Sequence, residues 1–460
     1  MKMGKNDLFK NVLVIGMGRS GNAAAKLLLS ADASVTVFDG NTSADTGAFE
    51  DMGCKAILGE DALSKADPAQ FSLAVISPGV PFDGSVATML KEAGVTIWGE
   101  IELAWYFEKG SVLAITGTNG KTTTTSLLGQ IAQSYNEHTI IAGNIGVPYT
   151  GMVQETSADS ITVLEISSFQ LETVTDFCPK VSAILNITPD HLDRHHTMEN
   201  YIKAKQDITK RQTKNEFCIL NAEDPYTEEF VKTCPASVVL FSSGKMPKEG
   251  FWYDNGVIYR VSGGQAERII ALDETHLLGT HNAENIMAAI AMAAAFGIPM
   301  DVILKAVKQF RAVEHRIEFV KNVNGVDYYN DSKGTNPDAA IKAIQAMNRP
   351  TWLIGGGYDK NASFDEWIES FDGKVRGLVL LGQTAEKIRE TAQRHGFENI
   401  YMAESLKEAV DICSSNAVDG EAVLLSPACA SWGMFKNFEE RGNMFKELVN
   451  SLKKGLMTLG

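Results

Sequence analysis

The chain has 460 residues, 44% of them hydrophobic and 22% charged, and 42 basic residues against 57 acidic ones leave a net charge of −15. These values exclude a disordered, collagenous or coiled-coil protein, and the length allows two or three domains. Nucleic acid and anionic membrane repel such a chain on average, so any phosphate it binds must be held by a local site. Six scattered cysteines, without a paired motif, predict reduced thiols in a cytoplasmic protein, and no signal peptide or membrane-spanning segment is predicted.

Short β-branched runs alternate with longer helical patterns along the whole chain. We interpret the following runs as buried strands: 12–15, 35–38, 73–76, 112–116, 161–164, 181–186, 217–221, 352–354, 378–381 and 423–425. Strands that are almost wholly apolar indicate parallel sheets covered on both faces. The predicted fold class is therefore α/β, with domains at residues 1–99, 100–312 and 313–460. Short strands and glycine turns between Phe251 and Leu278 predict a small antiparallel appendage on the central domain.

A glycine-rich turn follows the first predicted strand. Residues 16–21 (GMGRSG) open a helix rich in alanine and leucine, and Asp39 ends the next strand. The glycines permit a tight turn, and the helix N-terminus offers unpaired N–H groups to a phosphate. This pattern favours a Rossmann-like N-terminal domain that binds a nucleotide or diphosphate, although it does not say which one. The alternative is a strand–helix turn that is merely tight.

A second loop, residues 116–123 (TGTNGKTT), follows the strand at 112–115 and precedes a helix. Such a P-loop cradles phosphates with backbone N–H groups, brings a lysine to the β and γ oxygens, and offers a hydroxyl to Mg²⁺. The general spacing would require a glycine at position 115, where Ile115 stands, so this loop is a shorter variant. The central domain is therefore predicted to be a mononucleotide-binding α/β domain.

Metal-ligating side chains follow two of the central strands. Glu165 closes the strand at 161–164, and His191 and Asp193 lie just after the strand at 181–186. The carboxyl ends of parallel strands are where ligands bind in such sheets. Mg²⁺ prefers carboxylates and phosphate oxygens, and imidazole is a less common ligand. Lys205 lies on a helical stretch and is, by default, a solvated lysine.

In the last third of the chain, three polar loops follow predicted strands, at 331–336, 355–360 and 426–431. They place Lys333, Thr335, Lys360 and Ser431 on one rim, which together with Arg316 would bind an anionic small molecule. The alternative is a set of ordinary strand–helix connections. Within the first loop, Asn336 is a predicted helix cap and Pro337 fits the first helical position.

Eleven strings in order resemble the Mur ligases of bacterial cell-wall synthesis: GMGRSG, ITGTNGKTTT, GNIG, LEISSFQLE, NITPDHLDRH, YIKAK, GTHNAEN, EHRIE, NDSKGTNP, GGGYDK and SPACASWGMFKNFEERG. The resemblance spans essentially the whole chain, and the Ser-Ser-Phe-Gln run after Glu165 favours the branch that adds D-glutamate to UDP-N-acetylmuramoyl-L-alanine. It implies an ADP-forming ligase that works through an acyl phosphate, uses ATP and Mg²⁺, and is a cytoplasmic monomer with a second Rossmann-like domain at its C-terminus. The alternatives are a sister ligase with another amino-acid specificity, a folate polyglutamylating relative, and an NAD(P)-dependent dehydrogenase.

The resemblance also implies roles for single residues. The UDP-sugar would be bound by Arg19, Ser20, Asp39, Gly79, Asn144 and His191. ATP would be bound by Gly117, Thr118, Asn119, Gly120, Lys121, Thr122, Thr123, Asn282, Asn285, Arg316, Asp331 and Lys333. The metal would be held by Thr122, Glu165, His191 and a CO₂-carbamylated Lys205, and the expected catalytic residues are Lys121, Glu165, His191 and Lys205. The D-glutamate pocket would comprise Thr335, Lys360, Ser431 and Phe438. Gly40, Asn41 and Trp432 depart from the family pattern.

Overall fold

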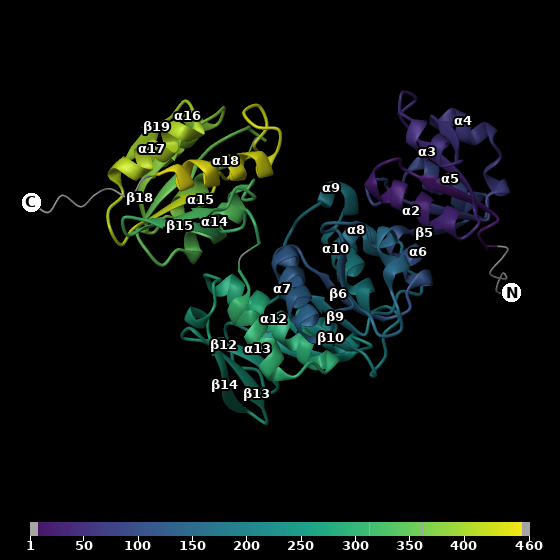
Figure 1. Cartoon of the computed structure of the whole chain (residues 1–460), viewed down its shortest axis with the longest axis horizontal. Coiled ribbons are helices and arrows are strands. Elements are labelled where there is room, and N and C mark those ends of the chain that lie inside the picture. The colour runs from purple at the N-terminus through teal and green to yellow at the C-terminus, as the bar shows by residue number, and fades with distance from the viewer. Residues whose placement is uncertain (1–7, 312, 361, 453–460) are drawn as a thin grey trace, which may run out of the picture. The chain divides into compact units, whose positions relative to one another are not determined.

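The computed structural model describes residues 8–311, 313–360 and 362–452. Contacts divide the chain into two compact units, of which unit 1 comprises Met1–Ala271 with Glu284–Lys308 and unit 2 comprises Leu272–Ala283 with Gln309–Gly460. Within the described residues the main strands form three sheets, two in unit 1 and one in unit 2 (Figure 1). The predicted α/β class is confirmed, and none of the six cysteines, all of which are described, forms a disulfide.

The first sheet of unit 1 is parallel and has the strand order β3-β2-β1-β4-β5. Its strands are β1 (Asn11–Ile15), β2 (Ser34–Asp39), β3 (Lys55–Leu58), β4 (Leu73–Ile76) and β5 (Thr96–Gly99). Its helices are α2 (Arg19–Ser30), α3 (Gly47–Asp51), α4 (Glu60–Lys65), η1 (Pro68–Gln70) and α5 (Ser85–Glu92). The order reverses between β1 and β4, so the loops after these two strands meet at the point where such sheets bind ligands.

The second sheet of unit 1 has the order β14-β13-β12-β11-β10-β9-β6-β8-β7. Its strands are β6 (Ser111–Thr116), β7 (Thr139–Gly143), β8 (Ile161–Glu165), β9 (Val181–Ile184), β10 (Phe217–Asn221), β11 (Ser237–Ser242), β12 (Gly250–Asp254), β13 (Val257–Ser262) and β14 (Gln265–Ala271). The strands from β7 to β11 are parallel to their neighbours, so the loops after β6, β7, β8 and β9 share one edge.

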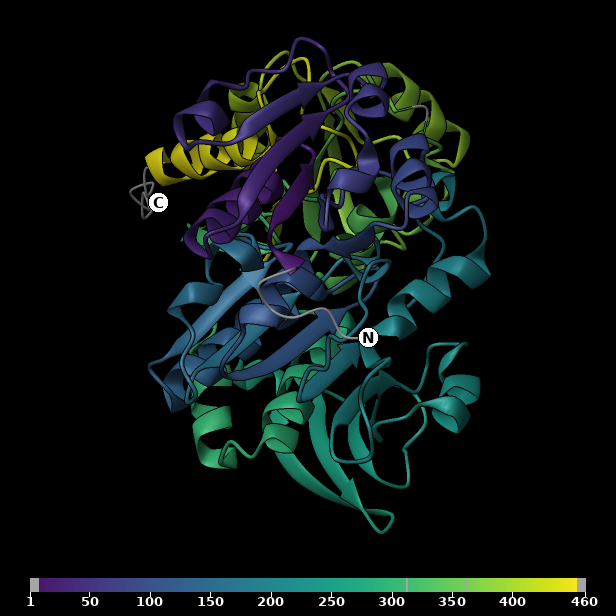
Figure 2. The ribbon, with the colours of Figure 1, turned by 90° about the vertical axis from the view of Figure 1, so that its right-hand side faces the viewer.

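The predicted antiparallel appendage is present as β12, β13 and β14. It is continuous with the central sheet, because β12 pairs with β11 in parallel at Phe241–Phe251 and Ser242–Trp252. Figure 2 shows this teal hairpin extending from the lower end of the sheet. A second difference concerns β9, which ends at Ile184 and not at Asn186. The side-chain amide of Asn186 accepts a hydrogen bond from the Asn119 N–H (2.8 Å) and donates one to the Asn119 carbonyl (3.1 Å).

The helical segments that follow in the chain include those around the central sheet: α6 (Glu100–Phe107), α7 (Lys121–Tyr135), η2 (Tyr149–Gly151), η3 (Val153–Glu155), α8 (Ser168–Leu171), α9 (Leu192–His195), α10 (Met198–Gln206), η4 (Asp207–Thr209), α11 (Thr227–Thr233), η5 (Leu272–Glu274), α12 (Thr280–Phe296) and α13 (Met300–Gln309). The longest apolar stretch, residues 286–300, lies mostly in α12. Among the described residues, no helix is both long and apolar enough to cross a membrane.

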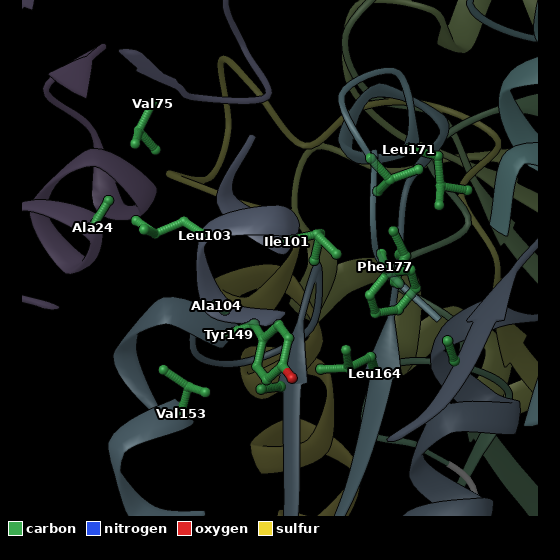
Figure 3. Packing of buried hydrophobic residues seen from close by; sticks show 14 of the residues in the cluster. Ala24, Val75, Ile101, Leu103, Ala104, Tyr149, Val153, Leu164, Leu171 and Phe177 are labelled. Carbon is green, nitrogen blue, oxygen red and sulfur yellow. The ribbon is translucent and has the colours of Figure 1, made fainter. Parts of the chain in front are cut away.

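Helix α6 packs against both sheets of unit 1. Figure 3 shows Leu103 pointing toward Ala24 and Val75, whereas Ile101 points the other way, toward Leu171 and Phe177. All six side chains are at most 2% exposed and belong to one hydrophobic cluster. Burial of apolar surface on two sides of one helix stabilises unit 1 as a single packed body. The predicted domain boundary after residue 99 coincides with the start of this helix.

Unit 2 contains a sheet with the order β15-β16-β20-β17-β18-β19, parallel except for β15. Its strands are β15 (Glu318–Val323), β16 (Val326–Asn330), β17 (Thr351–Gly355), β18 (Val375–Leu380), β19 (Ile400–Met402) and β20 (Ala422–Leu425). Its helices are α14 (Pro337–Ala346), α15 (Asp365–Glu369), α16 (Ala385–Arg394), α17 (Leu406–Asn416) and α18 (Phe438–Ser451). The predicted cap is confirmed, because the Asn336 side chain accepts a hydrogen bond from the Ala339 N–H (2.8 Å).

The two faces of this sheet carry separate cores. Leu353 of β17 packs in a cluster with residues of α14, α15 and α16, whereas Trp352 and Ile354 pack in a second cluster with residues of α17 and α18. Both faces are therefore covered, which explains why the parallel strands are almost wholly apolar. Only the loops at the strand ends remain for polar side chains with a function.

Candidate active site

The P-loop connects β6 to α7 in unit 1. Gly117 has φ +154° and Gly120 has φ +85°, and a Cβ on Gly120 would lie 2.3 Å from the Asn285 side-chain oxygen. Only glycine therefore fits at position 120. Lys121 is the first residue of α7, and its ammonium donates to the carbonyl oxygens of Gly117 (2.8 Å) and Thr118 (2.9 Å). The shorter loop thus places a lysine and a helix N-terminus together, as phosphate binding requires.

Glu165, the last residue of β8, lies at the same edge of the sheet and is 2% exposed. Its Oε1 accepts a hydrogen bond from Nδ2 of Asn144 (2.8 Å), and Asn144 N–H donates to the Glu165 carbonyl (2.8 Å). Its Oε2 is buried and has no hydrogen-bond partner in the part of the chain that the structure describes. A buried carboxylate oxygen left without a donor is costly, so this atom fits a cation ligand.

Lys205 on α10 is buried, with 2% of its surface exposed, so the default interpretation as a solvated lysine is wrong. Its ammonium donates to the Gly117 carbonyl (2.9 Å) and lies 4.5 Å from the ring centre of Tyr201. Burial, with a further contribution from Lys121, holds the pKa of Lys205 well below its usual range. The hydroxyl groups of Tyr201 and Thr118 are 3.0 Å apart, which fixes the helix to the P-loop.

His191 begins α9 with a left-handed backbone (φ 53°). Its half-exposed imidazole lies 3.5 Å from the carboxylate of Asp190 and 4.9 Å from the ring centre of Phe169. Among the described residues there is no preformed cluster of three or more His, Cys, Asp or Glu side chains that could hold a metal. A metal at Glu165 would therefore need ligands of other kinds, such as the Thr122 hydroxyl and substrate oxygens.

The segment after His191 contains residues whose importance the sequence analysis did not identify. The His195 imidazole is buried and has a partner at each ring nitrogen. Its Nε2 lies 2.9 Å from Ser168 Oγ, and its Nδ1 lies 3.2 Å from Glu172 Oε1. Burial lowers the pKa of His195 to about 4, so the ring is neutral near pH 7. Arg194 donates to Glu172 (2.9 Å) and to the carbonyl oxygens of Val80 (3.0 Å) and Pro78 (3.4 Å). The same segment therefore fastens the loop after β4 to the central sheet.

The glycine fingerprint at the end of β1 has the expected geometry. A Cβ on Gly21 would lie 1.9 Å from the Gly16 carbonyl oxygen, so helix α2 packs directly on the turn. The Asp39 carboxylate accepts hydrogen bonds from the N–H groups of Met17 (3.2 Å) and Asn41 (2.9 Å). Arg19 donates to the Gly146 carbonyl (2.5 Å), in the loop that also carries Asn144. Gly79 is exposed and Ser20 half-buried in the same part of unit 1.

In unit 2, the loop after β16 is tied to its neighbours by buried polar groups. Asp331 accepts hydrogen bonds from Ser426 Oγ (2.7 Å) and Ile317 N–H (3.3 Å), and burial raises the pKa of Asp331 to about 7. The buried Arg441 donates to Ser332 and to the Cys429 carbonyl. Sequence analysis did not single out Arg441, because a lone arginine on a helix gives no sign of its direction.

Two lysines of unit 2 lie over aromatic rings. The ammonium of Lys333 is 5.2 Å from the ring centre of Phe438, and that of Lys360 is 4.7 Å from the ring of Trp432. Tyr358 packs edge-on against Trp432 at 5.5 Å. Each of these two lysines of the predicted rim therefore has an aromatic partner. Of the other rim residues, Thr335 is half-buried and Ser431 is buried.

Three family models match the chain: the MurD-like N-terminal domain of Mur ligases at residues 10–99, the Mur ligase middle domain at 115–293, and the Mur ligase glutamate ligase domain at 315–429. A protein of Lachnospira eligens named UDP-N-acetylmuramoylalanine–D-glutamate ligase is 54% identical over 447 residues, which is 96% of this chain and 99% of that protein. The chain belongs to the Mur ligase family. A Thermoanaerobacter protein of the same name is 46% identical, covering 97% of this chain and 99% of its own length.

Solved Mur ligase structures share the fold. The UDP-N-acetylmuramate–alanine ligase MurC of Thermotoga maritima superposes with a TM-score of 0.60 at 18% identity, covering 96% of this chain and 100% of that chain. The MurF ligase of Thermotoga maritima, solved in complex with ADP, gives 0.58 at 16% identity, covering 97% and 99%. At these identities the likeness establishes the architecture and not the substrate.

The site residues of this Mur ligase fall into groups that the sequence could not separate. Gly117, Lys121 and Lys205 meet at one carbonyl oxygen of unit 1, and Asn285 touches the same loop through a hydrogen bond from Thr124 Oγ1 to Asn285 Oδ1 (3.2 Å). Asn282 lies on the same helix but belongs to unit 2, where its amide donates to the Leu278 carbonyl (2.7 Å).

Proposed function

We propose that this Mur ligase is a UDP-N-acetylmuramoyl-L-alanine:D-glutamate ligase, forming ADP and phosphate in cytoplasmic peptidoglycan precursor synthesis. Its relatives of that name match it from end to end at up to 54% identity. The observation in the structure that supports it best is the buried, unsatisfied oxygen of Glu165 at the same sheet edge as the P-loop, whose Gly117 carbonyl accepts hydrogen bonds from Lys121 and Lys205. This arrangement serves charge neutralisation between two anions, a sugar-nucleotide carboxylate and ATP.

The chemistry explains why phosphate binding and amide formation occur together. A carboxylate does not react with an amine directly, because oxide is too poor a leaving group. Transfer of the γ-phosphoryl group from ATP to the L-alanyl carboxylate gives an acyl phosphate and ADP. The D-glutamate amine then attacks the carbonyl carbon, phosphate leaves, and the amine loses a proton. Backbone N–H groups of residues 117–120 and the Lys121 ammonium would hold the phosphates in line for the first step.

The residues around Glu165 fit a magnesium ion. Thr122, Glu165, His191 and a modified Lys205 would hold it, and when bound it supplies positive charge beside the transferred phosphoryl group. Lys205 is suited to modification because burial favours its neutral amine. That amine would attack the carbon of CO₂, form an N–C bond and release a proton, which leaves a carbamate anion. The neighbouring Lys121 ammonium would stabilise that anion, because it carries the opposite charge.

The substrates would be distributed over both units. Arg19, Ser20, Asp39 and Gly79 would hold the UDP part of the sugar nucleotide, and Asn144 and His191 its reacting end. Residues 117–123 and Asn285 of unit 1 would bind ATP, and the proposed ATP-binding residues of unit 2 are Asn282, Arg316, Asp331 and Lys333. D-Glutamate would be bound by Thr335, Lys360, Ser431 and Phe438, and the protein would act as a monomer.

The test is ADP release with ATP, UDP-N-acetylmuramoyl-L-alanine and D-glutamate, omitting each substrate in turn. We expect ADP release only when all three are present. A panel of L-alanine, a diamino acid and L-glutamate in place of D-glutamate decides between this ligase and its sisters. Preference for any of those amino acids would contradict the D-glutamate assignment while leaving the ligase chemistry intact.

A further inference from the structure

Trp432 is an exposed tryptophan whose position the hydrophobic core does not explain. More than half of its surface, 53%, is exposed, and its neighbour Tyr358 is 40% exposed. The two rings pack edge-on at 5.5 Å, and the ammonium of Lys360 lies 4.7 Å from the Trp432 ring. Tryptophan and tyrosine are enriched at binding interfaces, where one part of the ring is apolar and the other polar. Here the contact that the structure records is with a cation.

The two loops that carry these residues are fixed to one another. Gly356 N–H donates to the Pro427 carbonyl (2.9 Å), and Tyr358 N–H donates to the Ala430 carbonyl (2.9 Å). A Cβ on Gly357 would lie 2.4 Å from the Ala430 carbonyl oxygen, so the loops are as close as their backbones permit. The backbone positions of Lys360 and Trp432 are therefore fixed by the contact between their loops. Only the torsions of the two side chains can change the distance between the ammonium and the ring.

The ionic surroundings of Lys360 leave its charge for something outside the protein. The neighbouring Asp359 carboxylate pairs with Lys387 (3.1 Å). Within residues 8–311, 313–360 and 362–452, Lys360 forms no salt bridge, and its recorded partner is the Trp432 ring. An aromatic face attracts an ammonium through its quadrupole but occupies only one side of it, so N–H groups remain for an anionic acceptor.

We propose that Trp432, supported by Tyr358, is a positioning residue that holds the Lys360 ammonium ready for a carboxylate of the amino-acid substrate. This inference rests on the proposed function, which places D-glutamate at Lys360. A lysine side chain has four rotatable bonds, and restricting them before binding raises affinity because less freedom is lost on binding. Trp432 acts through Lys360 and touches no reacting atom, so its effect belongs to binding of the amino acid.

The experiment compares Trp432→Phe and Trp432→Leu with the unmodified protein. We expect Trp432→Leu to raise KM for D-glutamate about tenfold and Trp432→Phe about threefold, following the strength of cation–π attraction. The values of kcat and of KM for ATP and the UDP-sugar should stay within twofold. Tyr135→Leu, which removes another exposed aromatic ring at the far end of α7, is the matched control and should change no KM.

A double-mutant cycle separates positioning from mere folding. In a Lys360→Met background, Trp432→Leu should raise KM no further, because the cation on which it acts is gone. An equal rise with and without Lys360, or a KM for Trp432→Leu within twofold of the unmodified protein, would overturn the inference. Failure of D-glutamate to support any ADP release would instead overturn the proposed function. The same cycle would then be measured with the amino acid that the panel identifies.

Discussion

Two lysines donate to one carbonyl oxygen, that of Gly117, and the residue pattern alone predicted a functional role for only one of them. Lys121 follows from the P-loop pattern, whereas Lys205 lies 88 residues further along the chain than Gly117. Two like charges so close together disfavour each other, and burial adds to the effect. Conversion of the Lys205 amine into an anion would remove this repulsion, which is a physical reason for modification at this position.

We expect Lys205→Ala to lower kcat about 100-fold or more, because the proposed carbamate ligand of the metal is lost. The unmodified protein, freed of CO₂ and bicarbonate, should lose activity in parallel and recover it when bicarbonate is added. Intact-protein mass spectrometry under mild conditions should detect the mass of one added CO₂, absent from the variant. Lys203→Ala, on the exposed face of the same helix, is the control. Full activity of Lys205→Ala would contradict the role given to this residue.

His195 predicts a dependence of stability on pH. Its pKa is about 4 in the folded protein and 6.5 unfolded, so the unfolded chain binds the proton first as the pH falls. The contribution of the neutral ring is complete above pH 6.5 and is lost progressively toward pH 4, by up to about 3 kcal/mol. Urea unfolding of the protein and of His195→Gln at pH 7.5 and 5 measures this. The difference in free energy of unfolding should shrink at pH 5, and a constant difference would contradict the prediction.

At the scale of elements, the loop after β9 connects three structures. It follows the strand next to the P-loop, carries His191, and through Arg194 bonds the loop after β4 in the first sheet. The carboxylate of Glu172, just after α8, contacts the side chains of both Arg194 (2.9 Å) and His195 (3.2 Å). One short segment therefore positions both the loop after β4 and His191, which we propose bind the UDP-sugar and the metal.

Arg194→Leu tests this connection. The change leaves the half-buried Glu172 carboxylate without its cation and two carbonyl oxygens without a donor, so we expect unit 1 to lose about 3 kcal/mol of stability. Glu172→Gln in addition should restore part of the loss, because the uncompensated charge is removed. Arg211→Leu, which breaks an exposed ion pair with Asp176, should cost less than about 1 kcal/mol. Equal losses for Arg194→Leu and Arg211→Leu, measured by urea unfolding, would contradict this account.

The strands that the sequence analysis left unidentified include those at sheet edges. β3, β5, β7, β15 and β19 each end a sheet and are partly exposed, so their residues lack a continuous apolar run. Most strands in the middle of the parallel sheets are buried on both faces and were recognised for that reason. The internal strand β11 was missed, and most of its residues are only half-buried. The hydrophobic pattern of a sequence indicates which strands are buried, and edge strands are the least buried part of a sheet.

At the scale of the whole molecule, an acidic protein acts on anions. The net charge of −15 excludes bulk attraction to phosphate, and the cations that matter are fixed locally. Lys121 and Lys205 bond a backbone carbonyl, and Lys333 and Lys360 lie over aromatic rings. Carbonyl dipoles and ring quadrupoles orient these side chains.

The sequence alone determined the α/β class, the two phosphate loops and the family resemblance, because glycine turns and buried strands leave local patterns. Only the tertiary structure decided which polar side chains are buried and which groups they meet. Lys205 changed from a solvated lysine to a buried one, and Arg194, His195, Arg441 and Trp432 gained partners far away in the chain. Residue type and spacing encode a side chain's chemistry, but its direction and its pKa depend on neighbours that folding brings from elsewhere.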